Sequence, residues 1–160
     1  MKNIYQSAII GLGKIGSSYP SKGAPRTHTE AHLKNKKINV AAGVDPSKNA
    51  RKDFSKKWGH KIPVFPSVKE MLYKIQPDIV SICVPTSKLI DTLKEFSKKP
   101  PKLYFLEKPV VNNSDNLKNI MTAINNIPTA VNYHRCWDPS HSLFFKKILK
   151  SGKVISLRII

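Results

Sequence analysis

Three glycines near the N-terminus have the spacing of a phosphate-binding turn. Gly11, Gly13 and Gly16 form a G-x-G-x-x-G pattern directly after the apolar run of residues 4–10. In such a pattern the first glycine permits a tight strand-to-helix turn, the second lets the backbone approach a pyrophosphate, and the third lets the helix pack closely on the strand. The phosphates then lie on the free N–H groups at the positive end of the helix dipole. An ordinary tight turn is the alternative, because the pattern alone is weak.

An acidic residue, Asp45, closes the second apolar run at residues 39–45. In a dinucleotide-binding fold, the acid at the end of the second strand accepts hydrogen bonds from the adenosine ribose, about 20 residues after the glycines. Asp45 lies farther along, and residues 17–26, which are rich in proline and glycine, account for the excess as an inserted loop close to the expected nicotinamide position. The alternative role of Asp45 is to cap the next helix. Both roles can coexist, and the glycines favour the ribose role.

Two histidines lie one turn apart on a predicted helix. Thr27 and Glu30 have the spacing of a capping box, so the helix is expected to begin at Thr27. His28 and His32 on this helix could hold a metal ion, but no third ligand is evident in the sequence. We therefore expect a surface helix and no metal site.

Composition indicates one ordinary domain. The chain has 160 residues, of which 40% are hydrophobic, enough to bury a substantial core. No apolar stretch approaches the roughly 20 residues of a membrane span, and residues 1–7 lack the apolar centre of a secretory signal. Cys83 and Cys136 make no disulfide framework or metal motif. A cytoplasmic protein without membrane contact is expected.

The chain is strongly basic, with 28 Lys+Arg against 10 Asp+Glu and a formal net charge of +18. Such an excess attracts polyanions. The lysines are scattered over predicted helices and loops, however, and no zinc-finger or aromatic RNA-binding motif accompanies them. Nucleic-acid binding is therefore the less favoured function.

Apolar runs alternate with helical patterns along the whole chain. The expected strands are 4–10, 39–45, 60–65, 78–84, 103–106, 129–133 and 154–160, and the expected helices lie at 27 onward, 46–58, 67–75, 87–96, 117–124 and 140–149. Pro63 makes 60–65 an edge or partial strand. Alternation of this kind implies right-handed crossovers and an α/β fold with a Rossmann-like, doubly wound parallel sheet. We expect residues 1–152 to form this domain and residues 153–160 to begin a second α/β domain.

Five motifs in a fixed order resemble the glucose–fructose oxidoreductase/inositol dehydrogenase/MocA family over residues 4–160. The motifs are Gly11-Leu12-Gly13-Lys14-Ile15-Gly16, Val44-Asp45-Pro46, Val80-Ser81-Ile82-Cys83-Val84-Pro85-Thr86, Glu107-Lys108-Pro109 and Asn132-x-x-Arg135-x-x-x-Pro139. The Glu-Lys-Pro tripeptide is far more specific than the glycines. The resemblance implies a Rossmann domain that binds NAD or NADP, followed by an α/β domain that carries substrate-binding groups and often mediates homo-oligomerisation. It also implies oxidation or reduction of a hydroxyl or carbonyl on a sugar, cyclitol or sugar nucleotide.

The resemblance assigns roles to individual residues. The implied cofactor-binding residues are Gly11, Gly13, Lys14, Ile15, Gly16, Asp45, Pro85, Thr86, Glu107 and Asn132. Lys108 is the implied catalytic residue beside the nicotinamide, and with Arg135 it borders the substrate. A positively charged ring disfavours the ammonium form of Lys108, which could then help move the proton of the reacting hydroxyl. The alternative is a solvated lysine before a proline turn.

The charge at Asp45 favours NAD, because a carboxylate repels a 2′-phosphate. Lys48 and Arg51 nearby leave NADP possible. Leu89 stands where family members often carry a histidine. The catalytic histidine of the family lies in the second domain, so we expect a truncated form that binds the cofactor, turns over little alone and self-associates through residues 154–160. A catalytically inactive dinucleotide-binding module is the alternative.

Overall fold

The computed structural model describes residues 4–21, 23–112, 117–133 and 138–150. Its six parallel strands form one sheet in the order β3-β2-β1-β4-β5-β6. The strands are β1 (Tyr5–Ile10), β2 (Ile38–Val44), β3 (Val64–Phe65), β4 (Ile79–Ile82), β5 (Leu103–Leu106) and β6 (Thr129–Val131). The chain starts in the middle of the sheet, winds to one edge and then to the other, which is the order of a doubly wound Rossmann fold. The expected fold class is confirmed.

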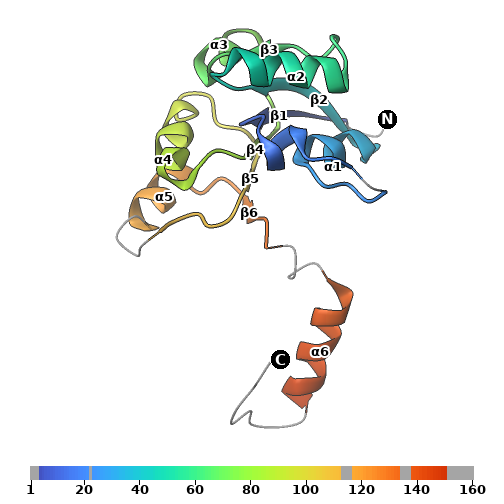
Figure 1. The fold of residues 1–160 in the computed structure, drawn as a ribbon. Coiled ribbons are helices and arrows are strands. Elements are labelled where there is room, and N and C mark those ends of the chain that lie inside the picture. Colours follow the sequence, from blue (N-terminus) through green and yellow to red (C-terminus); the bar gives the residue numbers. More distant parts are fainter. Residues whose placement is uncertain (1–3, 22, 113–116, 134–137, 151–160) are drawn as a thin grey trace.

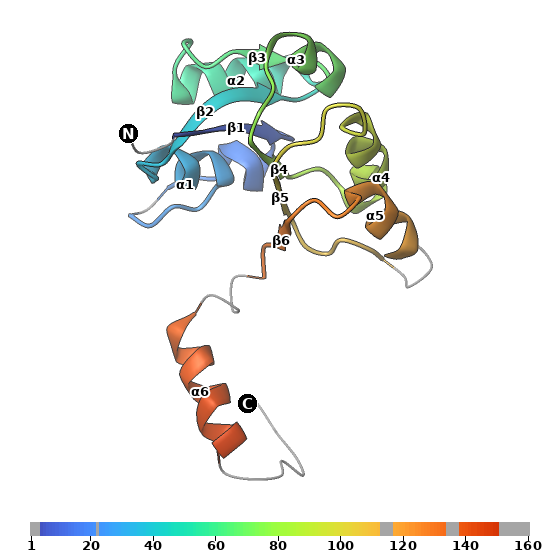
Figure 2. The same ribbon diagram turned by 180° about the vertical axis from the view of Figure 1, so that it is seen from behind.

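Helices cover both faces of the sheet (Figure 1). They are α1 (His28–Lys34), α2 (Lys48–Trp58), α3 (Val68–Lys74), α4 (Thr86–Glu95), α5 (Leu117–Ile124) and α6 (Pro139–Lys150), with a short π-helical turn η1 (Lys14–Ser18). The larger apolar core joins α3, α4 and α5 to one face, and a smaller core joins α2 to the other, where α1 and η1 also pack. Helix α6 stands apart from the sheet in both views (Figures 1 and 2).

Strand β1 shows how the sequence pattern builds these two cores. Ala8 and Ile10 belong to the larger core and Ile9 to the smaller one, because successive side chains of a strand point to opposite faces. All three are at most 3% exposed. A continuous apolar run is therefore the correct pattern for this central strand, which helices cover on both sides.

Short polar side chains fix where three helices begin. The hydroxyls of Thr27, Ser47 and Ser67 accept hydrogen bonds from the backbone N–H groups three residues later. These caps satisfy N–H groups that have no partner inside the helix. The predicted helix starts at Thr27 and Ser67 are confirmed, and β3 is the edge strand expected near Pro63.

The structure shows which side of two helices faces the sheet. On α1, His28 and His32 are each only 5% exposed, while Leu33 is 44% exposed, so the expectation that the histidine pair lies on a surface helix is wrong. On α5, Leu117 and Met121 are exposed and Ile120 is buried. This helix lies over the edge of the sheet near β6, so one narrow stripe of it reaches the core.

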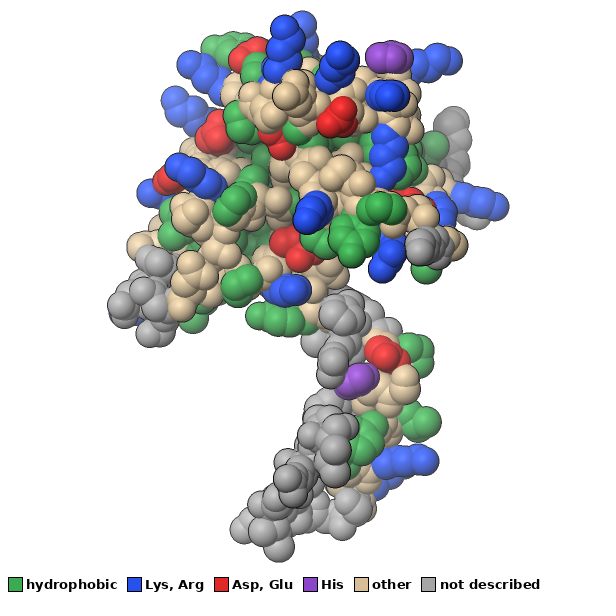
Figure 3. Space-filling model, in the orientation of Figure 1, with side chains coloured by type: hydrophobic (Ala, Val, Ile, Leu, Met, Phe, Trp, Pro, Cys, Tyr) green, Lys and Arg blue, Asp and Glu red, His purple; other side chains and the backbone are tan. Residues whose placement is uncertain are grey.

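The Lys and Arg side chains are spread over the visible face and gather in no single patch (Figure 3). Among the described residues no helix is long and apolar enough to cross a bilayer, and no three His, Cys, Asp or Glu side chains come together as a metal site. Arg135, Cys136 and the segment 151–160, with the expected strand 154–160, lie outside the described residues.

His32 is buried between α1 and the sheet in a complete set of hydrogen bonds. Its Nδ1 lies 3.0 Å from Ser7 Oγ and its Nε2 lies 3.2 Å from Ser81 Oγ. Ser7 Oγ itself donates to the carbonyl of Asn39, so Nδ1–H donates to Ser7 and the bare Nε2 accepts from Ser81. Burial, reinforced by the nearby His28, lowers the pKa of His32 from 6.5 to about 4.

This burial predicts a loss of stability at acidic pH. The unfolded chain binds a proton on His32 below pH 6.5, whereas the folded protein does so only below about pH 4. Stability therefore falls as the pH drops through this window, by about 3 kcal/mol in total. Urea unfolding of His32→Gln should lack this component, while the exposed His60→Gln should keep it. An unchanged pH dependence in His32→Gln would contradict the burial of a neutral imidazole.

Candidate active site at the carboxyl edge of the sheet

The predicted site residues gather where the strands end. A groove of about 490 Å³ runs along this edge between the glycine turn after β1, the end of β2 and the end of β4. Gly11, Gly13, Asp45 and Pro85 line it, together with Lys88 of α4. Ligands of open parallel sheets bind at this edge, at the point where the strand order reverses.

The three glycines are required at their positions for different structural reasons. Gly11 has a φ of +90°, and a Cβ there would lie 2.6 Å from the carbonyl oxygen of Cys83. A Cβ at Gly16 would collide with the carbonyl oxygen of Gly11. Gly13 has a negative φ, and a Cβ there would meet no atom within 4 Å. The first and third glycines therefore allow the turn to form, and the second keeps the groove open.

The helix expected after the glycines is only the five-residue π-helical turn η1. Lys14 and Ile15 form its first turn and are both exposed. The residues after it, which were expected to form an inserted loop, do connect η1 to α1.

Asp45 ties the glycine turn to the turn between β2 and α2. Its Oδ2 accepts a hydrogen bond from Leu12 N at 2.9 Å and its Oδ1 accepts one from Ser47 N at 2.8 Å. Arg51 Nη1 donates to the carbonyl oxygens of Asp45 and Pro46, at 2.6 and 2.9 Å. The N-cap of α2 is Ser47, so the alternative role of Asp45 as the helix cap is wrong.

The turn after β4 is connected to the Glu-Lys-Pro segment. Pro85 lines the groove and occupies the N-cap position of α4. Thr86 Oγ1 donates to the carbonyl of Pro109 at 2.9 Å. Leu89, at the position where relatives often carry a histidine, is 3% exposed in the larger core. This position therefore contributes to packing and not to the groove.

Glu107 is the centre of a polar cluster at the end of β5. Its Oε1 lies 2.8 Å from His28 Nε2 and accepts from Asn132 Nδ2 at 2.6 Å, while its Oε2 accepts from Lys108 N at 3.3 Å. Burial raises the pKa of Glu107, but the bonds from His28 and Asn132 outweigh it, so the net pKa is below its ordinary value. Glu107 is thus a carboxylate. The Lys108 side chain is exposed beside it.

Cys83 at the end of β4 lies next to this cluster. Burial, with a smaller contribution from the charge of Glu107, raises the pKa of its thiol. The thiol therefore stays protonated at neutral pH and is a poor nucleophile. This geometry gives Cys83 a packing role beneath the glycine turn.

The loop that joins η1 to α1 is anchored at both ends. Lys57 Nζ of α2 donates to the carbonyls of Ser17 and Tyr19, at 2.9 and 3.0 Å, and Trp58 Nε1 donates to Ser17 Oγ. Glu30 of α1 accepts from Ser21 Oγ at 2.6 Å. That bond, followed by one from the backbone N–H of Arg26, lowers the pKa of Glu30 to about 2.

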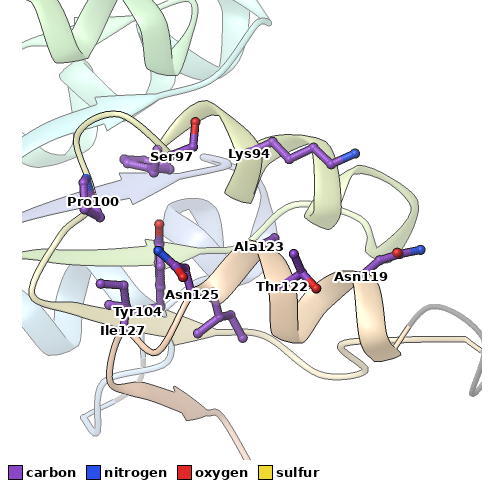
Figure 4. Close-up of a pocket in the computed structure, with 11 residues that line it drawn as sticks. Lys94, Ser97, Pro100, Tyr104, Asn119, Thr122, Ala123, Asn125 and Ile127 are labelled. Atoms are coloured by element: carbon purple, nitrogen blue, oxygen red, sulfur yellow. The ribbon is translucent and has the colours of Figure 1, made fainter.

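A second cavity, of about 280 Å³, lies away from this edge between α4, β5 and α5. Figure 4 shows Tyr104, Asn125 and Ile127 around it. None of the predicted site residues lines it. The groove at the glycine turn is therefore the candidate active site.

Known proteins share this fold and pattern. A family model described as an oxidoreductase family with an NAD-binding Rossmann fold matches residues 5–132, and no curated protein matches the chain. Among solved structures, scyllo-inositol dehydrogenase from Lactobacillus casei, crystallised with NAD(H) and scyllo-inositol, aligns with a TM-score of 0.72 and 19% identity. The alignment covers 96% of this chain and 43% of that chain.

Two further structures are similar to the same degree. Myo-inositol dehydrogenase from Corynebacterium glutamicum has a TM-score of 0.73 and 17% identity, covering 92% of this chain and 41% of that chain. The WlbA dehydrogenase from Chromobacterium violaceum, in complex with NADH and UDP-GlcNAcA, has a TM-score of 0.72 and 15% identity, covering 94% and 41%. The chain spans less than half the length of each of these structures.

The open space at Gly13 predicts how a substitution acts. Gly13→Val places a branched side chain in the groove without a clash in the protein itself. We expect NADH affinity to fall by about 100-fold or more, roughly 2.7 kcal/mol, while the melting temperature changes little. The exposed Ser18→Val in the same π-helical turn is the matched control. Full affinity in a folded Gly13→Val protein would contradict the proposed phosphate position.

The carboxylate of Asp45 predicts the choice of cofactor. Asp45→Ala removes the charge that repels a 2′-phosphate, so the ratio of NADP affinity to NAD affinity should rise on the order of tenfold. The substitution also removes the acceptor of two backbone N–H groups, which can change both affinities together. The measurement is therefore the ratio of the NADP affinity to the NAD affinity. Asp53→Ala, at an exposed acid of α2, should leave the ratio unchanged. Equal ratios in both variants would restrict Asp45 to a structural role.

Proposed function

The chain belongs to the glucose–fructose oxidoreductase/inositol dehydrogenase/MocA family as its NAD-binding Rossmann domain, and we propose that it is the cofactor-binding domain of a dehydrogenase that acts on a sugar, cyclitol or sugar nucleotide. The single observation that carries this proposal is the edge of the sheet where the glycine turn, Asp45 and the Glu107 cluster meet. The names of the structural neighbours support the substrate class.

The residues of the groove suit a dinucleotide. Gly13 leaves open space where a pyrophosphate must approach the backbone. The carboxylate of Asp45, held by two backbone N–H groups, keeps lone pairs for the ribose hydroxyls. Its charge favours NAD over NADP, and the Arg51 guanidinium is occupied by two backbone carbonyls.

Bound NAD supplies a nicotinamide ring that accepts or donates a hydride. The protein's contribution is to position the reactants and move a proton. Lys108 follows Glu107 directly at the end of β5 and is exposed toward solvent, so its amine is available to a substrate hydroxyl. In its uncharged form this amine can take the hydroxyl proton as a general base.

Asn132 and Glu107 fix the geometry of the sheet edge at which the reacting groups would bind. Asn132 donates to Glu107 across the ends of β5 and β6, which fixes both strand ends relative to each other. We assign Pro85 and Thr86 to the wall of the groove, since Thr86 is bonded to Pro109, and Arg135 to the substrate. We further assign residues 1–152 to the cofactor domain and residues 153–160 to the beginning of a substrate domain, through which homo-oligomers would form.

Fluorescence titration with NADH tests the proposal directly. The purified chain should enhance and shift the emission of NADH in a saturable manner, and NAD should displace it more readily than NADP. Absence of saturable binding in a folded chain would contradict the proposed function. Saturable binding with robust turnover of a sugar, cyclitol or sugar nucleotide would favour the enzyme over the dinucleotide-binding module.

Turnover should depend on Lys108. We expect Lys108→Ala to lower kcat about 100-fold or more, because proton transfer to a positioned side chain typically contributes that much. NADH affinity should stay within about twofold, since the cofactor is held by other residues. Lys118→Ala, at an exposed lysine of α5, is the matched control in steady-state assays. Equal kcat values for the two variants would remove Lys108 from the mechanism.

A further inference from the structure

His28 is a buried polar residue that the proposed mechanism does not use. It is the first residue of α1 and is only 5% exposed. Its Nε2 lies 2.8 Å from Glu107 Oε1, and its ring packs on Phe105 at a centroid distance of 5.0 Å. Its Nδ1 has no hydrogen-bond partner among the described residues.

The two ring nitrogens of His28 show that its hydrogen bond to Glu107 determines the position of the ring. Glu107 is a carboxylate and can only accept, so the proton of the His28–Glu107 bond must lie on Nε2. A buried nitrogen without a partner destabilises the folded state, because it has lost its hydrogen bonds to water. The cost at Nδ1 is offset by one charge-assisted hydrogen bond at Nε2, which is roughly twice as strong as a neutral one. The ring is therefore placed for Glu107 and for no other polar group described.

The bond joins two distant parts of the chain. Residues 28 and 107 are separated by 79 positions, and Asn132 donates to the same oxygen from the end of β6. With both donors on Oε1, the carboxylate has one orientation, in which Oε2 faces the backbone N–H of Lys108. Holding Glu107 in this way holds the start of the segment that carries Lys108.

We propose that His28 is a positioning residue, whose Nε2–H fixes the Glu107 carboxylate and thereby the Glu107–Lys108 segment at the nicotinamide end of the groove. The inference rests on the proposed function, because the segment matters for catalysis only if NAD binds there. The arrangement of α1 supports it: the loop before α1 is bonded to α2, and Thr29 Oγ1 donates to the carbonyl of Gly16 at 2.7 Å. His28 thus stands on a helix fixed to the glycine turn itself.

The groups that face Glu107 predict its titration when His28 is replaced. They are His28 from α1, Cys83 directly after β4, Asn132 directly after β6, and Lys108 on its own segment. Without the hydrogen bond from His28, the burial of the carboxyl is less well compensated, so its pKa should rise. A role limited to filling space would not produce this change.

Two substitutions of His28 test whether its hydrogen bond to Glu107, rather than the volume of its side chain, is what matters. Glutamine places its amide near the position of Nε2 and can still donate to Glu107, whereas asparagine is too short to reach it. We compare His28→Gln with His28→Asn, and use His32→Asn as the matched control. His32 lies one turn further on α1 and is equally buried, and among the described residues its ring bonds Ser7 and Ser81.

Carboxyl ¹³C NMR of the full chain labelled at the glutamate side chains follows the pKa without any cofactor. The chain contains only four glutamates, Glu30, Glu70, Glu95 and Glu107, so each signal can be assigned. The pKa of Glu107 should rise in His28→Asn and stay near the wild-type value in His28→Gln and His32→Asn. In parallel, NADH affinity should fall about tenfold in His28→Asn alone, because Glu107, which is assigned to cofactor binding, is then no longer held in position.

The proposal is overturned if the Glu107 pKa is the same in His28→Asn and wild type, or if His32→Asn changes it equally. Should His28→Asn not fold, ¹⁵N spectra of the wild-type imidazoles decide the matter, because a proton on Nδ1 of His28 with a bare Nε2 contradicts the hydrogen bond. Failure of the wild-type chain to bind NADH would overturn the proposed function instead. The carboxyl titration would still decide whether His28 holds Glu107.

Discussion

The close contact between the glycine turn and the end of β4 is the constraint on which the site depends. The backbone at Gly11 lies so near the carbonyl of Cys83, and Gly16 so near the carbonyl of Gly11, that neither position has room for a Cβ. Because of this contact, η1 packs closely on the sheet, and Gly13 faces open space. The edge that results is bounded by Asp45 on one side and by the Glu107 cluster on the other. The groove is therefore a consequence of backbone packing before any side chain contributes chemistry.

Polar side chains then connect the elements around this turn. Asp45 joins the turn to the start of α2, Lys57 and Trp58 join the end of α2 to η1, and His28 joins α1 to Glu107. Each bond spans more than 30 residues of sequence. Helix α1 is thus bonded both to the glycine turn, through Thr29, and to Glu107, through His28. Such connected, buried networks hold a site in one geometry when every member that matters is satisfied.

Features set by local pattern were predictable from the sequence. The helix starts at Thr27 and Ser67 depend on a hydroxyl and an N–H three residues apart, and the strand at residues 79–82 depends on its own apolar run. The order of the elements was sufficient to predict the sheet. The clustering of Asp45, Pro85, Glu107 and Asn132 then followed, because parallel strands end at one edge.

Features set by contacts between distant segments were not predictable. A pair of histidines one turn apart has the same spacing on a surface helix and on a buried one, so the sequence alone could not place His28 against Glu107. The exposure of Met121 depends on α5 lying at the edge of the sheet. Ser47 caps α2 in place of Asp45, whose carboxylate instead accepts a hydrogen bond from Leu12, 33 residues away. Arg135 was assigned from the motif order and stays a prediction.

The most direct test of the account is a map of backbone amide shifts on addition of NADH. In ¹H–¹⁵N spectra of the labelled chain, the amides of Leu12, Gly13 and Lys14 should shift most, and those of Asp45 and Lys108 should shift with the same saturation curve. Amides around the second cavity, such as Ser97 and Ile127, should stay unchanged. Shifts centred on the second cavity, or no shifts at the glycine turn, would contradict the placement of the cofactor at the carboxyl edge of the sheet.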